Sequence, residues 1–235
     1  MTDHEPVLLV HGLATSAART WGETGWIDLL ADEGRTVIAP DLPGHAGAPF
    51  DPARSGQIDD SVLGWFPEGP FDAVGFSLGA RTLLGLAADH PGRIARLVVA
   101  GVGANLFRDD DHTPLAAAIE SITEVEPSGE RAAEVDPIVA GLAHHFTELA
   151  RASGTDPAVV AELLRGSGGR RLDAERLSHI DADVLVVLGT DDFAGPAGPL
   201  VDALPSAHLV ELPGVDHFAT PKSMRFLDAA LRFLG

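Results

Sequence analysis

Short runs of β-branched residues and leucine recur along this chain, and segments of helical length lie between them. Six such runs are typical of buried strands, namely Val7–Val10, Thr36–Ala39, Asp72–Gly75, Leu97–Ala100, Val184–Leu188 and His208–Leu212. The patterns between and after them predict helices at Trp26–Glu33, Leu78–Asp89, Pro199–Leu204 and Pro221–Leu234. Strands that alternate with helices favour a mostly parallel sheet with helices on both faces. We therefore predict an α/β fold whose sheet has about six strands.

The interval at residues 102–183 lacks this alternation. It contains helical patterns alone, at Pro114–Ile122, Pro137–Ala152 and Pro157–Leu164. Asp156 before Pro157 combines an N-cap residue with proline at the first helical position, which is a helix start signal. We therefore predict a core domain of residues 1–101 and 184–235, with a helical cap inserted at residues 102–183.

The charge balance excludes some classes of partner. The 235 residues carry 16 Lys and Arg against 35 Asp and Glu, a formal net charge of −19. Such a chain repels nucleic-acid phosphates and anionic lipid surfaces at long range, so we expect no nucleic-acid binding. No apolar run reaches the roughly 18–20 residues of a membrane span, and Met1–Pro6 has neither a basic nor an apolar signal region. We expect a cytoplasmic protein without a membrane span.

The sequence contains no pattern that would hold a cofactor or a metal. No G-x-G-x-x-G opens a strand–helix unit, and there is neither a cysteine nor a metal-ligand spacing. His144 and His145 are adjacent in a predicted helix, where side chains point about 100° apart, so we expect one buried and one exposed histidine and no shared metal. We therefore expect no cofactor, no metal and a small-molecule substrate as the partner. The oligomeric state stays open.

The pentapeptide Gly75-Phe76-Ser77-Leu78-Gly79 lies between a predicted strand and a predicted helix. In this context G-x-S-x-G is the pattern of a nucleophile elbow, a sharp turn that presents the serine beside a helix N-terminus. Glycine on both sides removes the Cβ atoms that would clash in such a turn. The alternative is a glycine-lined turn with an incidental serine, because the pattern is short and the chain contains 26 glycines.

Four further motifs accompany the elbow. They lie at Val10–Leu13, Asp41–His45, Gly189–Asp192 and Gly214–Phe218. In order and spacing, the five motifs resemble those of the α/β-hydrolase superfamily. The resemblance covers the chain from Val7 onward, outside the cap, and implies an α/β-hydrolase fold. The hairpin that usually precedes the first strand in this family has no residues to form it, so we expect a minimal member.

The resemblance implies a catalytic triad of Ser77, Asp192 and His217, in the chain order that this family uses. A serine hydroxyl needs a base within hydrogen-bond distance, and His217 would be that base. The imidazole in turn needs a carboxylate that fixes its tautomer and stabilises its positive charge. Asp192 matches the family pattern G-x-x-D counted from Gly189, so we prefer it to Asp191, for which a solvated loop position is the simpler interpretation.

The same resemblance implies an oxyanion hole made by two backbone N–H groups, those of Leu78 and Leu13. His11 is similar to a first-loop histidine that supports this loop in the family. Asp41 and His45 are expected to organise a turn and a loop, because Asp before Pro-Gly is first of all a turn former.

Together these residues predict a serine hydrolase that cleaves a small or medium carboxylic ester through an acyl-enzyme. A second interpretation is a cofactor-free lyase, in which the same triad abstracts a proton. It rests on Ser77–Arg81, which resembles the elbow and carboxylate-binding arginine of the menaquinone-pathway succinyl-hydroxy-cyclohexadiene-carboxylate synthases. A perhydrolase of the haloperoxidase type and a non-catalytic ligand-binding member of the fold are further alternatives.

Two side chains are candidates for contact with the substrate. Arg81 would bind a substrate carboxylate, although an arginine on a helix can equally pair with an acid or pack along its stem. Trp21 follows the oxyanion loop and would line the mouth of the pocket, with plain helix packing as the alternative.

Overall fold

A computed structural model describes residues 5–54, 56–108, 111–124, 136–166 and 172–235 of the chain. The first four residues, on which part of the expected location rests, lie outside these ranges. No helix within the ranges combines the length and the apolar character of a membrane span.

The described residues form one six-stranded sheet in which every neighbouring pair of strands is parallel. Its strands are β1 (Val7–Val10), β2 (Val37–Ile38), β3 (Phe71–Phe76), β4 (Ile94–Ala100), β5 (Asp183–Gly189) and β6 (Ala207–Leu212). They lie in the order β2-β1-β3-β4-β5-β6. The predicted α/β fold and its six strands are therefore confirmed, with β3 and β4 starting earlier than their apolar patterns suggested.

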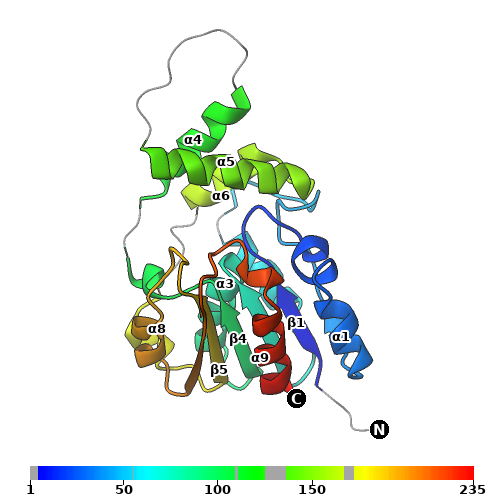
Figure 1. The fold of residues 1–235 in the computed structure, drawn as a ribbon. Helices are drawn as coiled ribbons and strands as arrows, with labels where there is room; N and C mark the ends of the chain where they lie inside the picture. The colour runs from blue at the N-terminus through cyan, green and yellow to red at the C-terminus, as the bar shows by residue number, and fades with distance from the viewer. Residues whose placement is uncertain (1–4, 55, 109–110, 125–135, 167–171) are drawn as a thin grey trace.

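Helices cover both faces of this sheet (Figure 1). The helices of the described residues are α1 (Trp26–Asp32), α2 (Gln57–Gly64), α3 (Leu78–Asp89), α4 (Thr113–Glu124), α5 (Pro137–Ala152), α6 (Pro157–Gly166), α7 (Ala174–Leu177), α8 (Gly198–Ala203) and α9 (Met224–Leu234), with short helical turns η1 (Ala18–Gly22), η2 (Ala104–Phe107) and η3 (Thr220–Lys222). Sequence reasoning did not predict α2. This helix is short and carries few apolar residues, so its pattern was weak.

The continuous apolar strands are explained by burial on both sides. In β1, Leu8 and Val10 belong to the cluster that includes α3, whereas Val7 and Leu9 belong to the cluster that includes α1 and α9. All four side chains are buried. Because successive strand residues point to opposite faces, a strand covered on both faces must be apolar at every position.

The helices α4, α5 and α6 pack on one another in a third apolar cluster, beyond the carboxyl ends of the strands (Figure 1). This cluster also takes up Ala14, Leu13 and Phe218 from loops of the core. Two other parts of the interval predicted as cap pack differently, since Leu106 of η2 and Leu177 of α7 belong to the core cluster around α3. The cap boundaries at residues 102 and 183 stay a prediction.

Candidate active site

Ser77 lies in the sharp turn between β3 and α3, with φ +53° and ψ −112°. A positive φ is unfavourable for a residue with a side chain, so the surrounding structure must hold this conformation. The two flanking glycines permit the close packing. A Cβ atom at Gly75 would lie 2.6 Å from Ala80 Cα, and one at Gly79 would overlap the carbonyl of Val10 in β1. The predicted strand-to-helix turn at Ser77 is therefore present.

Ser77, His217 and Asp192 come together from three separate segments after β3, β6 and β5. His217 Nε2 lies 3.0 Å from Ser77 Oγ, and His217 Nδ1 lies 2.9 and 3.0 Å from the two carboxylate oxygens of Asp192. Asp192 and His217 are buried. The neighbouring Asp191 instead accepts a hydrogen bond from Thr190 Oγ1 at an exposed position. The carboxylate that meets the histidine is thus that of Asp192.

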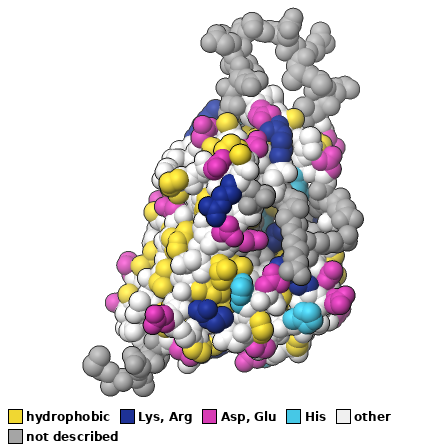
Figure 2. Space-filling model, turned by 180° about the vertical axis from the view of Figure 1, so that it is seen from behind, with side chains coloured by type: hydrophobic (Ala, Val, Ile, Leu, Met, Phe, Trp, Pro, Cys, Tyr) yellow, Lys and Arg dark blue, Asp and Glu magenta, His cyan; other side chains and the backbone are white. Residues whose placement is uncertain are grey.

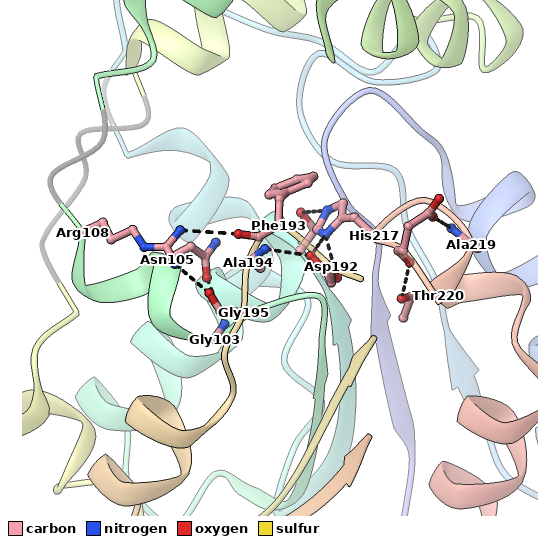
Figure 3. A network of polar contacts seen from close by, with 12 residues as sticks. Gly103, Asn105, Arg108, Asp192, Phe193, Ala194, Gly195, His217, Ala219 and Thr220 are labelled. Atoms are coloured by element: carbon pink, nitrogen blue, oxygen red, sulfur yellow. Dashed lines mark hydrogen bonds and ion pairs between the residues drawn. The ribbon is translucent and has the colours of Figure 1, made fainter. Parts of the chain in front are cut away.

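Backbone groups and aromatic rings hold this arrangement in place (Figure 3). The Ala194 N–H donates to Asp192 Oδ1 over 2.9 Å. The ring of His217 also packs against those of Phe193 and Phe76, with centroid distances of 4.3 and 5.0 Å. These contacts leave the imidazole little freedom to rotate away from the serine.

Two buried histidines support the loop that contains Leu13. His11 Nε2 accepts from the Leu42 N–H over 3.0 Å, and His45 Nε2 accepts from the Ala14 N–H over 3.1 Å. Burial, together with the nearby His45 ring, lowers the pKa of His11 to about 3. Burial also lowers the pKa of His45. Both rings are therefore neutral and available as acceptors near neutral pH.

Asp41 adds a third contact to the same loop, because its Oδ1 accepts from the Ala17 N–H over 2.8 Å. Ala14 itself has φ +63°, so the loop contains a strained turn that these side chains hold. Such contacts fit the organising roles expected of His11, Asp41 and His45.

A cavity of about 910 Å³ opens over Ser77. Leu13, Leu78 and Arg81 line it from the core, and Leu142 and Phe146 line it from α5. This cavity lies between the core and the helices predicted as a cap. The residues that line it include the predicted nucleophile, the two predicted oxyanion-hole residues and Arg81.

Arg81 and the acidic residue Asp59 both line this cavity, and their charges influence each other. Burial lowers the pKa of Arg81, while the charge of Asp59 on α2 opposes that shift. Burial likewise raises the pKa of Asp59, against the effect of Arg176 and Arg81. Sequence reasoning missed Asp59 because it did not predict α2, and no local motif marks the residue.

Trp21 does not lie at the mouth of the cavity, so that prediction is wrong. Its side chain is fully buried among the residues that pack α1 and α9 on the sheet. Its ring contacts Trp26 edge-on at a centroid distance of 5.2 Å. The turn η1 directs the indole into the core, where its apolar area is removed from water.

The described residues contain no group of three or more His, Asp or Glu side chains placed to hold a metal ion. His144 and His145 are both exposed, which corrects the expectation that one would be buried. The ring of His145 lies against Phe218 at 3.8 Å between centroids.

On the face shown in Figure 2, the basic side chains are separated by acidic and apolar ones, unlike the continuous basic surface of a nucleic-acid site.

An α/β sheet with a serine elbow, a buried histidine and a buried aspartate at its carboxyl edge defines the α/β-hydrolase class. Residues 7–229 match the sequence model described as the alpha/beta hydrolase family. The chain belongs to this family.

Relatives of the chain include the pimeloyl-[acyl-carrier protein] methyl ester esterases of two bacteria. The chain is 30% identical to that of Chromobacterium violaceum over 237 residues, which cover 90% of this chain and 86% of the relative. It is also 30% identical to that of Neisseria meningitidis over 213 residues, which cover 81% of this chain and 62% of the relative.

Among solved structures, the enol-lactonase from Burkholderia xenovorans LB400 has the same fold. Its TM-score is 0.69 at 21% sequence identity, and the match covers 99% of this chain and 92% of the other.

Proposed function

We propose that this protein is a serine hydrolase that cleaves a small or medium carboxylic ester through an acyl-enzyme on Ser77. The observation that carries the proposal is the continuous chain of hydrogen bonds from Ser77 Oγ through His217 to Asp192, together with the position of Ser77 in the lining of a cavity of about 910 Å³. With the Nδ1 proton held by the carboxylate, Nε2 is free to accept the serine proton.

The reaction would begin with attack of Ser77 Oγ on the ester carbonyl carbon, as its proton moves to His217 Nε2. The backbone N–H groups of Leu13 and Leu78 would stabilise the negative charge on the carbonyl oxygen. Collapse of this intermediate breaks the bond to the leaving alcohol, which takes the proton from His217. Water activated by the same histidine then releases the carboxylic acid, and Asp192 stays ionised throughout.

The substrate is proposed to be a small molecule or a carried acyl group with an anionic part. The guanidinium of Arg81 lines the same cavity as Ser77 and would bind a carboxylate by paired hydrogen bonds. The relatives named for a pimeloyl methyl ester support ester cleavage as the reaction. The net charge of −19 supports the absence of a nucleic-acid partner, and a cytoplasmic location stays a prediction.

A lyase is the second candidate, because Arg81 borders the cavity one helical turn beyond Ser77. In that reaction the triad would remove a proton from a carboxylated substrate, and no acyl-enzyme would form. Esters would then be poor substrates, whereas elimination would depend on Arg81.

The test compares wild type, Ser77→Ala and the control Ser178→Ala, which changes an exposed serine at the end of α7. Each protein is assayed with esters of short to medium acyl chains and labelled with a fluorophosphonate. We expect Ser77→Ala to show no labelling and a kcat that is lower by about 10⁴- to 10⁶-fold, whereas the control variant should behave like the wild type. Ester turnover retained by Ser77→Ala would refute the nucleophile. No ester turnover by wild type, with Arg81-dependent elimination, would favour the lyase, and binding without turnover would indicate a carrier.

A further inference from the structure

The segment that follows β4 runs beside the loop that carries Asp192. The Ala104 N–H donates to Pro196 O over 2.8 Å, and the Asn105 N–H donates to Ala194 O over 3.1 Å. Gly103 allows this approach, because a Cβ atom there would lie 2.8 Å from Pro196 O. Backbone hydrogen bonds therefore join the turn η2 to the Asp192 loop, at one side of the site (Figure 3).

Arg108, just after η2, adds the side-chain part of this contact. Its Nη2 donates to Gly195 O over 2.6 Å, and its Nη1 donates to Phe193 O over 3.4 Å (Figure 3). The first bond is short, and a charged donor makes it stronger than a neutral pair. Among the residues that the structure describes, no carboxylate forms an ion pair with Arg108. The two carbonyls are thus the partners of the guanidinium.

One peptide group links the hydrogen bond between Arg108 and Phe193 O to the triad. The Phe193 carbonyl and the Ala194 N–H belong to the same peptide plane, and that N–H donates to Asp192 Oδ1 over 2.9 Å. Asp192 Oδ1 in turn accepts from His217 Nδ1 over 2.9 Å. Hydrogen bonds at the two ends of a peptide group polarise each other, so a cation at the carbonyl strengthens the N–H as a donor.

The same loop places an aromatic ring over the histidine. Phe193 packs on His217 with a centroid distance of 4.3 Å, although 47% of Phe193 remains exposed. The centroid of the ring also lies 6.2 Å from that of Phe218, and because about half of Phe193 is exposed, its position depends in part on its backbone. Arg108 holds that backbone on both sides of Ala194.

We propose that Arg108 is a positioning residue, which fixes the Phe193–Ala194 peptide and through it the Asp192 carboxylate and the His217 ring. This inference rests on the proposed function for its effect on turnover, since it assigns Arg108 a role in orienting the base. It assigns the residue no contact with the reacting atoms. Because Arg108 also lines the cavity, direct binding of substrate is the competing role to be tested.

The kinetic test compares Arg108→Ala and Arg108→Lys with the control Arg93→Ala. Arg93 also donates to a backbone carbonyl, that of Pro67 over 2.6 Å, but it lies outside the cavity lining. With a neutral ester, we expect Arg108→Ala to lower kcat by about 10- to 100-fold with KM unchanged, because small misplacements of catalytic groups cost this much. Arg108→Lys should recover part of kcat, since an ammonium can still donate to Gly195 O. A raised KM with unchanged kcat would instead show a substrate contact and overturn the proposal.

A second measurement needs no substrate. The His217 Nδ1 proton, hydrogen-bonded to Asp192, gives a low-field proton NMR signal that can be assigned by its loss in His217→Gln. We expect this signal to move upfield or broaden through exchange with water in Arg108→Ala, and to stay in place in Arg93→Ala. An unchanged signal in Arg108→Ala would refute the positioning role. If the wild type cleaves no ester, the proposed hydrolysis fails while this signal still tests the role of Arg108.

Discussion

His11 provides a direct link between acidity, folding and the loop of the site. The ring is fully buried, its Nδ1–H donates to Gly12 O over 2.8 Å, and its Nε2 accepts from the Leu42 N–H over 3.0 Å. Protonation of Nε2 would remove that acceptor and would place a charge where water cannot reach it. The pKa of His11 is accordingly lowered to about 3, chiefly by burial.

The direction and size of the effect follow from proton linkage. An unfolded histidine binds its proton near pH 6.5, whereas folded His11 binds one only near pH 3. The unfolded state therefore holds more protons between these values, so the free energy of unfolding decreases as the pH falls below 6.5. Each unit of pKa difference corresponds to about 1.4 kcal/mol. At about pH 5, His11 therefore lowers the free energy of unfolding by about 2 kcal/mol. Solvent does not screen this effect, because the ring is fully buried.

Urea unfolding of wild type, His11→Gln and His179→Gln at about pH 7.5 and about pH 5 measures this penalty. The glutamine at position 11 can still accept from the Leu42 N–H but cannot titrate, and His179 is an exposed control. Between the two pH values, we expect wild type and His179→Gln to lose about 2 kcal/mol more stability than His11→Gln. Equal losses in all three proteins would refute the account of His11 as a neutral buried acceptor.

Two further predictions concern the site. Asp192→Asn should lower kcat by about 10⁴-fold, because an amide holds the imidazole in the wrong tautomer, whereas Asp191→Asn should change kcat little. Steady-state kinetics of both variants test this, and a larger loss of kcat in Asp191→Asn would reverse the assignment. Arg81→Ala should leave a neutral ester unaffected and lower kcat/KM for a matched ester with a terminal carboxylate by about 10- to 100-fold, the loss of a charged hydrogen-bonded pair. Equal losses with both esters would contradict a carboxylate-binding role.

The sequence predicted the features that local patterns specify. The strands β1, β3 and β5 are buried along nearly their whole length because both of their faces are covered, so their apolar runs stood out from their surroundings. The elbow at Ser77 needs glycine on either side, as the close approach of Gly79 to β1 explains. The motif spacing distinguished Asp192 from Asp191 as the partner of His217, because neighbouring residues in a turn direct their side chains differently.

Features that depend on contacts between distant segments were not predicted. Trp21 was placed at the cavity mouth because nothing in a short helical segment tells which way an indole points, and tertiary packing directed it inward. The helix α2 begins after Gly56, which has φ +72°, and its few apolar residues become a face only against the core. Asp59 lines the cavity because it lies on this helix. Arg108 donates to Gly195 O, although the two residues are 87 positions apart in the sequence.

The link between Arg108 and Asp192 follows from the order of the strands. The loops that leave parallel strands in the same direction meet at one edge of the sheet, and β4 and β5 are neighbours. A helical layer inserted between these two strands must therefore begin beside the loop after β5, which carries Asp192. Three residues of the segment after β4, namely Ala104, Asn105 and Arg108, donate hydrogen bonds to that loop. In this topology, hydrogen bonds connect the start of the helical layer to the loop whose Asp192 carboxylate contacts His217.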